Sequence, residues 1–444
     1  MKFPELSKKE GSFFIANLFI ILYNVNHGGG CLKEKLIKKL NDLYYKTLAK
    51  EKHRNALNNF LFFFLWKLAF FVSSLKGTDK KLILFVANND YEMPKEYKAL
   101  YDTAKKNGYK CICLYRFKGG SRVIFKNELS KIKSDLVFQK YYARAKTVFL
   151  YDYYLPAYAN KPKKGTRLVQ LWHGCGAFKK WGYSTKDSSW GMNGKLLQKY
   201  HVHKNYTDVV TSSSYIIPKY AEAFGISEEI ISPVGVPRTD VYFDEEFVNG
   251  QHQVLLGKYP ELAGKKLILW APTFRGNSFS TSYNEKAIDF LKFKDALGEN
   301  TALLIKLHPH VAEKLSFTEE EKAALSGFVF DISQTVLIDT ALCACDMVIA
   351  DYSSLIFEYA LLSRPMIFFA YDLEEYTKER SFYYDYESFV PGKIVKNTDE
   401  LIEAIKAAKM NYDKEKLSVF KEKFMSACDG NSTQRIFEKF IKNG

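Results

Sequence analysis

From Lys80 onward, short apolar runs alternate with amphipathic segments, and this alternation constrains the fold more than any other feature of the chain. The first series contains KLILFVANND, CICLYRF, TVFLYDYY and RLVQLWHG, and the pattern restarts with KLILWAPTF, TALLIKLHPH, GFVFDI, CDMVIADYSS and PMIFFAYD. Such alternation is typical of βα units around a mostly parallel sheet. The 444 residues also exceed the roughly 250–300 at which one core stops growing. We therefore predict two consecutive α/β domains, joined by a polar linker near residues 245–262.

The region before residue 79 has a different character. Its apolar stretches, Phe13–Val25 and Phe60–Val72, are shorter than the roughly 20 residues that a spanning helix needs. The first stretch imitates a signal peptide, but no A-x-A-like cleavage site follows it. Between them, Lys33–Arg54 places leucines among lysines, as interfacial helices do at anionic membranes. We expect residues 1–78 to be helical and to associate with a membrane surface; a helical bundle packed on the main body is the alternative.

Charge and cysteine content narrow the class of partner and the compartment. Lys and Arg outnumber Asp and Glu by 65 to 50, which favours an anionic partner: nucleic acid, an acidic membrane or a phosphorylated substrate. Nothing in the sequence resembles a nucleic-acid-binding module, so we expect no nucleic acid. The seven cysteines are odd in number, and their two close pairs have C-x-C spacing, which fits neither a disulfide framework nor a zinc knuckle. A reducing, cytosolic compartment follows.

Polar loops follow four of the predicted strands. His173-Gly174 comes after LVQLW, residues 272–276 (PTFRG) after LILWA, residues 308–310 (HPH) after LLIKL, and residues 351–354 (DYSS) after MVIA. Open parallel sheets bind ligands beyond the carboxyl ends of their strands. The sequence therefore predicts that these loops carry the chemistry.

Two histidines in these loops are candidate catalysts. His173 precedes Gly174 and Gly176, which let the backbone approach a ligand, and an imidazole can remove a proton from an attacking hydroxyl. A histidine hydrogen-bonded between two loops is the alternative. His308, near Lys306, can donate to a phosphate or protonate a leaving group. His308 and His310 form a pair two residues apart, but a metal site is disfavoured because no carboxylate or third histidine stands close to them in the sequence.

Further side chains are suited to anions and hydroxyls. Ser353 and Ser354 precede an apolar helix whose N-terminus can cradle phosphate, although the same residues are common N-caps. Glu358 lies on the same helical face and can accept hydrogen bonds from a ribose or polyol. Arg238 offers a rigid fork for phosphate oxygens, with an ion pair to Asp240 as the alternative.

Several common motifs are absent from the sequence. GxxxxGK[ST], GxGxxG after a strand and GxSxG do not occur in the right setting. Walker-type nucleotide hydrolysis, dinucleotide redox chemistry and α/β-hydrolase chemistry are therefore not supported, and no cofactor is evident.

Over residues 80–440 the chain resembles the CDP-glycerol glycerophosphotransferase family of teichoic-acid and capsule synthesis. The resemblance is carried by QLWHGCGAFKKWG, SPVGVPRTD, LWAPTFRG, IKLHPH and the long segment that begins with ADYSSLIFEYALLSRPMIFFAYD. It implies a GT-B-like pair of Rossmann-like domains after the N-terminal region. Residues 79–250 would form the acceptor domain, and residues 251–444 the CDP-polyol-binding domain with the C-terminal helices.

The resemblance also implies an activity. It is transfer of glycerol phosphate from CDP-glycerol to a hydroxyl of a lipid-linked, undecaprenyl-type saccharide or of a polymer, with release of CMP. The enzyme would be a peripheral protein at the cytoplasmic face of the cell membrane, bound to its anionic surface, and a divalent cation such as Mg²⁺ would be able to assist the donor diphosphate. The alternatives are a CDP-ribitol ribitolphosphotransferase, a GT-B glycosyltransferase that uses a nucleotide sugar, and an inactive basic scaffold.

Family roles carry over to matching positions. His173 and His308 would be catalytic. The remaining matches would bind substrate: Trp172, Gly174, Cys175, Gly176, Arg238, Pro272, Thr273, Arg275, Lys306, Ser353, Ser354 and Glu358. Glu358 stands where polymerases of the family have Asp. The WHxxGxxKKxG form is similar to members that add the first glycerol phosphate to a lipid-linked disaccharide, which favours a single addition over processive polymerisation.

Overall fold

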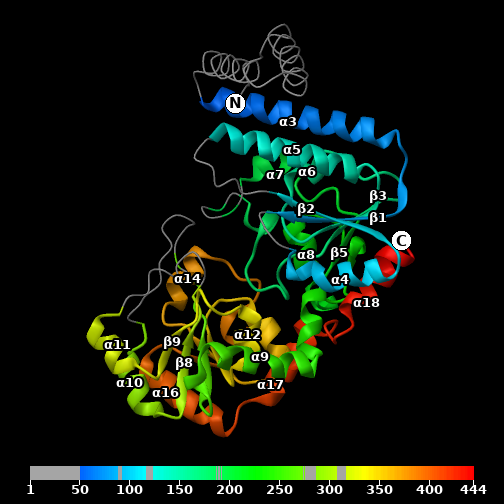
Figure 1. Ribbon diagram of the computed structural model, residues 1–444. Helices are drawn as coiled ribbons and strands as arrows, with labels where there is room; N and C mark the ends of the chain where they lie inside the picture. Colours follow the sequence, from blue (N-terminus) through cyan, green and yellow to red (C-terminus); the bar gives the residue numbers. More distant parts are fainter. Residues whose placement is uncertain are drawn as a thin grey trace, which may run out of the picture. The chain divides into compact units, whose positions relative to one another are not determined.

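The computed structural model describes residues 51–88, 93–116, 124–186, 188, 191, 193–273, 275, 287–307 and 317–444 (Figure 1). The chain forms two compact units, Met1–Leu65 and Trp66–Gly444. The apolar stretch Phe13–Val25, most of the basic segment Lys33–Arg54 and the predicted catalytic residue His308 lie outside the described residues.

The first sheet is parallel throughout. In spatial order it contains β2 (Lys110–Arg116), β1 (Asp79–Asn88), β3 (Ala145–Leu150), β4 (Arg167–Gln170), β5 (Asp208–Val210) and β6 (Ile231–Ser232). Its connections contain α4 (Lys95–Lys106), α5 (Ile124–Tyr142), α6 (Leu155–Tyr158), η1 (Gly182–Thr185), α7 (Gly194–Lys199), η2 (Ser214–Ile216), α8 (Ile217–Phe224) and η3 (Glu228–Ile230). The central strands are buried on both faces, which explains their continuous apolar runs.

The second sheet is also parallel. Its spatial order is β12 (Lys393–Val395), β11 (Met366–Phe369), β10 (Met347–Ala350), β7 (Lys266–Trp270), β8 (Thr301–Ile305) and β9 (Val329–Asp331). Its connections contain α10 (Phe290–Leu297), α11 (Glu319–Leu325), α12 (Ile338–Ala344), α13 (Leu355–Leu361), α14 (Leu373–Glu379) and α15 (Tyr386–Phe389), and α16 (Thr398–Met410) follows β12. This is the strand order of dinucleotide-binding Rossmann folds, with its switch point between β7 and β10. The predicted α/β class with parallel sheets is confirmed.

The segment near residues 245–262 lies between the last strand of the first sheet and the first strand of the second, but it is helical and not an irregular polar linker. The segment folds as η4 (Pro237–Phe243), α9 (Glu245–Lys258) and η5 (Pro260–Leu262). The carboxylate of Asp244 caps α9 by accepting a hydrogen bond from the backbone N–H of Phe247 at 3.0 Å, and Leu255 is fully buried. The cap and the buried face outweigh the turn-forming Asn-Gly sequence inside the helix.

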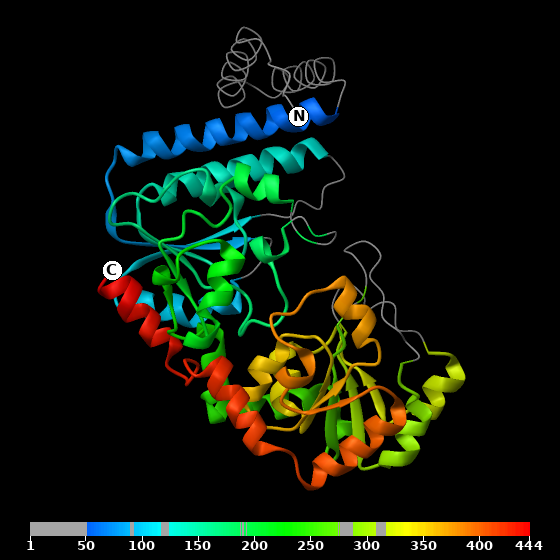
Figure 2. The same cartoon turned by 180° about the vertical axis from the view of Figure 1, so that it is seen from behind.

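The end of the chain does not stay with the second sheet. After α17 (Lys414–Met425), the segments α18 (Ser432–Ile436) and η7 (Phe437–Lys442) return to the first sheet, as the red ribbon in Figure 2 shows. Phe437 and Phe440 pack in one cluster with Phe85, and the backbone carbonyl of Phe440 accepts a hydrogen bond from the Thr147 hydroxyl at 3.0 Å. The expectation that residues 251–444 form one domain with the C-terminal helices is therefore corrected: the last turns pack on the first sheet.

The first and second sheets, each with its helices, form two lobes. The loop after β4, in the first lobe, packs against the second lobe. Lys179 forms an antiparallel β-bridge with Phe382, and the backbone N–H of Tyr383 donates to the carbonyl of Phe178 at 2.9 Å. The ring of Phe178 stacks on Phe382 and Phe389, with centroids 4.8 and 4.6 Å apart. Backbone pairing and ring stacking together fix this loop between the two sheets.

The helix α3 (Glu51–Ser74) contains the apolar stretch Phe60–Val72. Its C-terminal part lies in the larger unit, where Trp66 is buried and Phe70 packs edge-on against Tyr142 at 5.2 Å. In the part of the chain that the structure describes, no helix has both the length and the apolar character needed to cross a bilayer.

Candidate functional site

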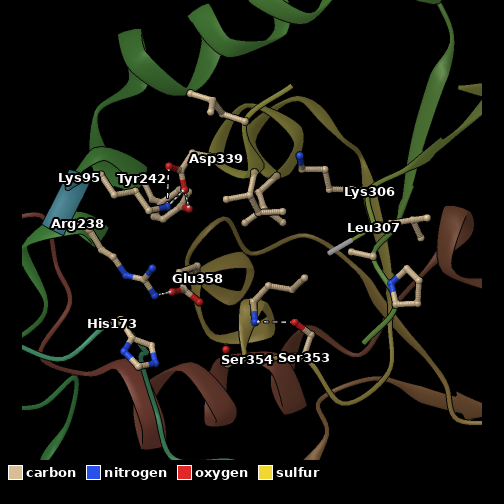
Figure 3. A pocket seen from close by; sticks show the side chains of 16 residues that line it. Lys95, His173, Arg238, Tyr242, Lys306, Leu307, Asp339, Ser353, Ser354 and Glu358 are labelled. Carbon is tan, nitrogen blue, oxygen red and sulfur yellow. Dashed lines mark hydrogen bonds and ion pairs between the residues drawn. The ribbon is translucent and has the colours of Figure 1, made fainter. Parts of the chain in front are cut away.

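A cavity of about 390 Å³ opens at the carboxyl ends of the two sheets (Figure 3). Its polar lining comes from both lobes and consists of Lys95, His173, Arg238, Tyr242, Lys306, Asp339, Ser353, Ser354 and Glu358. The apolar lining consists of Ala271, Pro272, Leu307, Leu337, Ile338, Leu342 and Leu355. Loops that follow β7 and β10 meet here at the switch point of the second sheet, which is where open α/β sheets bind ligands.

His173 is held at the cavity by a strained turn. Trp172 directly precedes it and has a φ of 60°, a conformation that is rare for a bulky residue. The two rings lie 4.2 Å apart. The Nδ1 atom of His173 is 3.6 Å from Oδ1 of Asp152, and the imidazole side chain is 48% exposed. An exposed imidazole with a carboxylate behind it is arranged as a base with an orienting partner.

Gln170 connects this pair to the interior. Its Oε1 accepts the backbone N–H of Trp172 at 2.9 Å, and its Nε2 donates to the carbonyl of Asp152 at 3.3 Å and to the Tyr206 hydroxyl at 2.8 Å. His203 lies behind Tyr206, with Nδ1 2.9 Å from the hydroxyl. Burial lowers the pKa of His203 to about 3, so this ring is neutral. The network positions both members of the His173–Asp152 pair.

Arg238 lies at the centre of a buried ionic cluster. It pairs closely with Glu358, and its Nη1 is 3.7 Å from Oε1 of Glu96. Burial alone would lower the pKa of Arg238, but the carboxylates, Glu358 first, outweigh it and raise the pKa well above its usual value. Within the described residues, Oε2 of Glu358 and Nε of Arg238 have no hydrogen-bond partner. Glu358 thus lines the cavity, and its Oε2 is a buried acceptor without a partner.

The alternative Arg238–Asp240 pair does not form. Asp240 instead accepts the backbone N–H groups of Ser432 and Thr433, at 3.0 and 2.8 Å, and so caps α18. The guanidinium therefore remains oriented toward the cavity.

Cys175 is a buried thiol beside Arg238. One guanidinium nitrogen lies 3.9 Å from its sulfur. Burial, followed by the charge of Glu358, raises the pKa of Cys175 well above its usual value. The thiol is therefore protonated and is not a nucleophile.

Lys306 and the two serines line the second-lobe side. The Nζ atom of Lys306 donates to the carbonyl of Ser333 at 2.7 Å, and burial lowers its pKa. Ser353 accepts the backbone N–H of Leu355 at 3.4 Å, and Ser354 directly precedes α13. The serine hydroxyls are placed where both N-capping and ligand contact can occur.

Thr273 and Arg275 do not line the cavity. The backbone N–H and hydroxyl of Thr273 donate to the carboxylate of Asp351, at 3.0 and 2.7 Å. Arg275 pairs with Asp351 at 3.0 Å and with Asp372 at 2.6 Å, and its guanidinium lies 4.9 Å from the ring of Tyr352. These contacts hold the loop after β7 in place without lining the cavity.

A second, smaller cavity of about 190 Å³ borders the same histidine. It is lined by Trp172, His173, Gly174, Cys175, Gly176, Ala177, Phe178, Lys179, Trp181, Tyr220 and Ser354. Gly176 has a φ of 62°, and a Cβ atom there would lie 2.3 Å from the Phe357 ring, so only glycine fits. Of the predicted site residues, Trp172, Gly174, Cys175 and Gly176 line this cavity instead of the larger one.

Sequence reasoning missed four polar residues of the site. Asp152 lies beyond the end of β3, and that position is a signal that could have identified it. Lys95, Tyr242 and Asp339 have no such signal. They come from distant segments that fold together: the ammonium of Lys95 donates to Asp339 at 2.8 Å, and the Tyr242 hydroxyl donates to it at 2.7 Å.

Within the described ranges, the structure brings together no group of three or more His, Cys, Asp or Glu that could hold a metal ion. His308 lies in the undescribed residues 308–316, so its predicted role stays a prediction.

Comparison with known proteins gives a consistent result. A family model described as CDP-glycerol:poly(glycerophosphate) glycerophosphotransferase matches residues 68–442. A teichoic acid ribitol-phosphate primase of Bacillus spizizenii is 38% identical over 306 residues, which cover 68% of this chain and 77% of that protein. A teichoic acid glycerol-phosphate primase of Bacillus subtilis is 28% identical over 411 residues, which cover 88% and 99%.

Longer relatives and solved structures extend the comparison. A teichoic acid poly(ribitol-phosphate) polymerase of Bacillus spizizenii is 35% identical over 395 residues, and the match covers 88% of this chain but 61% of that protein. A solved structure of the wall teichoic acid polymerase TagF has a TM-score of 0.68 at 22% identity, covering 92% of this chain and 97% of the other. This likeness shows that the fold is shared.

Proposed function

Because the chain belongs to the CDP-glycerol:poly(glycerophosphate) glycerophosphotransferase family, we propose that it transfers a polyol phosphate from a CDP-activated donor to a hydroxyl and releases CMP. The sequence resemblance to this family is thereby confirmed. One observation carries the proposal most directly: His173, Arg238 and Ser354 line a single cavity at the carboxyl ends of both sheets. Glycerol phosphate is the transferred group that the family description names.

The reaction assigns His173 the role of base. It takes the proton of the acceptor hydroxyl, and the oxygen attacks the phosphorus that carries the polyol. A new P–O bond forms to the acceptor, and the bond from that phosphorus to the bridging oxygen breaks, so CMP leaves with the electron pair. Asp152 orients the imidazole and stabilises the imidazolium that forms. Such transfers depend mainly on positioning and charge stabilisation.

The donor fits the larger cavity by charge and by hydrogen bonding. Arg238 and Lys306 supply cations for a diphosphate, and Ser353 and Ser354 supply hydroxyls. Glu358 also lines this cavity, where its carboxylate holds Arg238.

Ribitol phosphate is the second candidate for the transferred group, and the sequence identities to the curated relatives favour it over glycerol phosphate. The ribitol-phosphate enzymes are 34–39% identical to this chain, whereas the glycerol-phosphate enzymes are 25–30% identical. Both donors share the CDP group and differ only in the length of the polyol, so the same cavity and base serve either reaction.

The first test is CMP release from CDP-glycerol, CDP-ribitol and UDP-sugars, with a lipid-linked acceptor in detergent. Wild type is compared with His173→Ala, and Val419→Ser, on the exposed face of α17, is the matched control. We expect release from one CDP-polyol that is lost only in His173→Ala. Turnover of a UDP-sugar alone would replace the proposal with a glycosyltransferase, and no turnover would favour a scaffold. Repeating the assay with EDTA and with Mg²⁺ tests the divalent cation.

We extend the proposal to the acceptor and the membrane. A lipid-linked acceptor at the cytoplasmic face would require the enzyme to reach the bilayer surface. Phe71 and Val72 of α3 and the following Leu75 are 62%, 54% and 73% exposed. Exposed apolar side chains in a chain whose N-terminal sequence is basic suit an anionic interface.

Vesicle sedimentation tests this extension. The full chain is expected to pellet with phosphatidylglycerol vesicles at low salt and less with phosphatidylcholine vesicles. Replacing Phe71, Val72 and Leu75 with serine should reduce pelleting, whereas Val419→Ser should not. Equal pelleting of both variants would remove these residues from the membrane contact.

A further inference from the structure

The smaller cavity beside His173 contains a cation without a polar partner. In the described part of the chain, the ammonium of Lys179 makes no hydrogen bond or ion pair, and its named contact is the Tyr376 ring, 5.4 Å away. Burial lowers the pKa of Lys179 to about 8, while the charge of Asp351 acts in the opposite direction. Lys179 is partly buried, and an ammonium held partly out of water without a counter-charge is stabilised when an anion joins it.

The walls of this cavity are aromatic and include a second unsatisfied donor. The indole Nε1 of Trp181 is buried and has no hydrogen-bond partner among the residues described here. Tyr220 donates its hydroxyl to the carbonyl of Gly174 at 3.1 Å and so holds the turn after His173. An ammonium and an indole N–H are both donors, which suits an anion or a hydroxyl-rich ligand.

The backbone around Lys179 is fixed in place. Its β-bridge to Phe382 joins the two lobes, and the N–H of Lys180 donates to the carbonyl of Ser381 at 2.9 Å. A ligand that binds Lys179 therefore meets a pre-ordered loop, which reduces the entropic cost of binding.

The position of the cavity fits the geometry of transfer. Attacking and leaving oxygens lie roughly in line on opposite sides of the phosphorus. The two cavities share only His173 and Ser354 among their lining residues. A donor in the larger cavity would therefore be attacked from the smaller one, with the base between them.

We propose that the smaller cavity is the acceptor subsite, and that Lys179 binds the phosphate that precedes the attacked hydroxyl. This inference rests on the proposed function. At about 190 Å³, the cavity takes the terminal unit of an acceptor and leaves the rest outside. Lys179 then selects acceptors that end in a polyol phosphodiester over neutral ones.

The test compares two synthetic acceptors that share one alkyl tail. The first ends in a polyol joined through a phosphodiester, and the second ends in the same polyol joined through a neutral ether. Kinetics are measured at saturating CDP-polyol for wild type, Lys179→Met, Lys179→Arg and the control Lys180→Met. Lys180 is the neighbouring lysine, and it lies 5.9 Å from the Tyr383 ring, outside the cavity lining.

The expected result is specific to one acceptor and one lysine. Lys179→Met should raise the KM for the phosphodiester acceptor by about tenfold or more, because a charge-assisted hydrogen bond is lost, and should leave the ether acceptor unchanged. Lys179→Arg should retain most of the affinity, and Lys180→Met should behave as wild type. An unchanged KM in Lys179→Met, or an equal loss for both acceptors, would overturn the proposal.

A binding readout separates this inference from the function on which it rests. Quenching of the Trp172 and Trp181 fluorescence by the phosphodiester acceptor is measured without donor. Binding that requires Lys179 but is followed by no turnover of any CDP-polyol would reject the transferase and keep the anion site. Turnover with acceptor binding that ignores Lys179 would reject the site alone. Thermal melting of each variant confirms that it is folded.

Discussion

The loop after β4 and the loop after β7 both carry residues that sequence analysis assigned to the site, yet the two loops have different roles. His173, in the first loop, is 48% exposed and has one carboxylate 3.6 Å away. Arg275, in the second, is 14% exposed and is held by the carboxylates of Asp351 and Asp372. The imidazole of His173 is available to a ligand, whereas the guanidinium of Arg275 is already bound by carboxylates of the protein.

This difference separates residues that act on a ligand from residues that hold the site together. Both kinds occur at the carboxyl ends of strands, and both are polar. Only the number and quality of their partners distinguishes them. The comparison predicts that substitution of His173 lowers turnover with little loss of stability, and that substitution of Arg275 does the reverse.

The largest effect is expected for His173→Ala. Loss of the base should lower kcat by about 10²–10⁴-fold, because proton removal from the acceptor hydroxyl is no longer assisted. The melting temperature should stay close to that of wild type, since the exposed imidazole makes few contacts. CMP release and a thermal melt of the same sample check both parts. A large fall in melting temperature would show that His173, like Arg275, mainly holds the site together.

Arg275→Met is the opposite test. Removing the guanidinium leaves the buried carboxylates of Asp351 and Asp372 without their cation, which should cost about 3–5 kcal/mol in the free energy of unfolding. Denaturant unfolding measures this change. Protein that remains folded at low temperature should keep a donor KM near that of wild type. A raised KM with unchanged stability would contradict the bracing role and make Arg275 a ligand contact.

The fold class was predictable because buried parallel strands leave continuous apolar runs such as LILFVA and LLI. The predicted linker lies between the two sheets, but it is helical at α9, where a capping carboxylate on Asp244 and the buried Leu255 outweigh an Asn-Gly pair. The return of Phe437 and Phe440 to the first sheet was not predictable, because an amphipathic segment does not specify which sheet it covers.

The site was predictable in its strand-end residues and not in its partners. His173, Arg238 and Ser354 were identified by position, and the structure brings them to one cavity. Asp152 follows β3, and that position was an available signal. Asp339 lies in α12, and its pairing with distant segments leaves no local signal. Arg275 was assigned to substrate because sequence cannot reveal that two carboxylates already bind it.

Asp152→Asn, in the loop after β3, sharpens the comparison by testing the partner of His173. The substitution keeps the shape of the side chain and removes the charge that faces His173 Nδ1. We expect kcat to fall by about tenfold, with donor KM unchanged, because the imidazolium formed during proton transfer loses its counter-ion. Asp152→Glu should restore part of the rate. A change in KM alone would show that Asp152 contacts the donor instead of positioning the base.

The smallest effect is expected for Lys95→Met, at the rim of the larger cavity. Lys95 and Asp339 lie 2.8 Å apart across the lobes, but their side chains are 42% and 20% exposed, so water screens the pair. The free energy of unfolding should fall by less than about 1 kcal/mol, and the effect should vanish at high salt. Donor KM should rise by no more than about fivefold. A larger rise that persists at high salt would mean that Lys95 binds the donor diphosphate directly, and would move it from the bracing residues to those that act on the ligand.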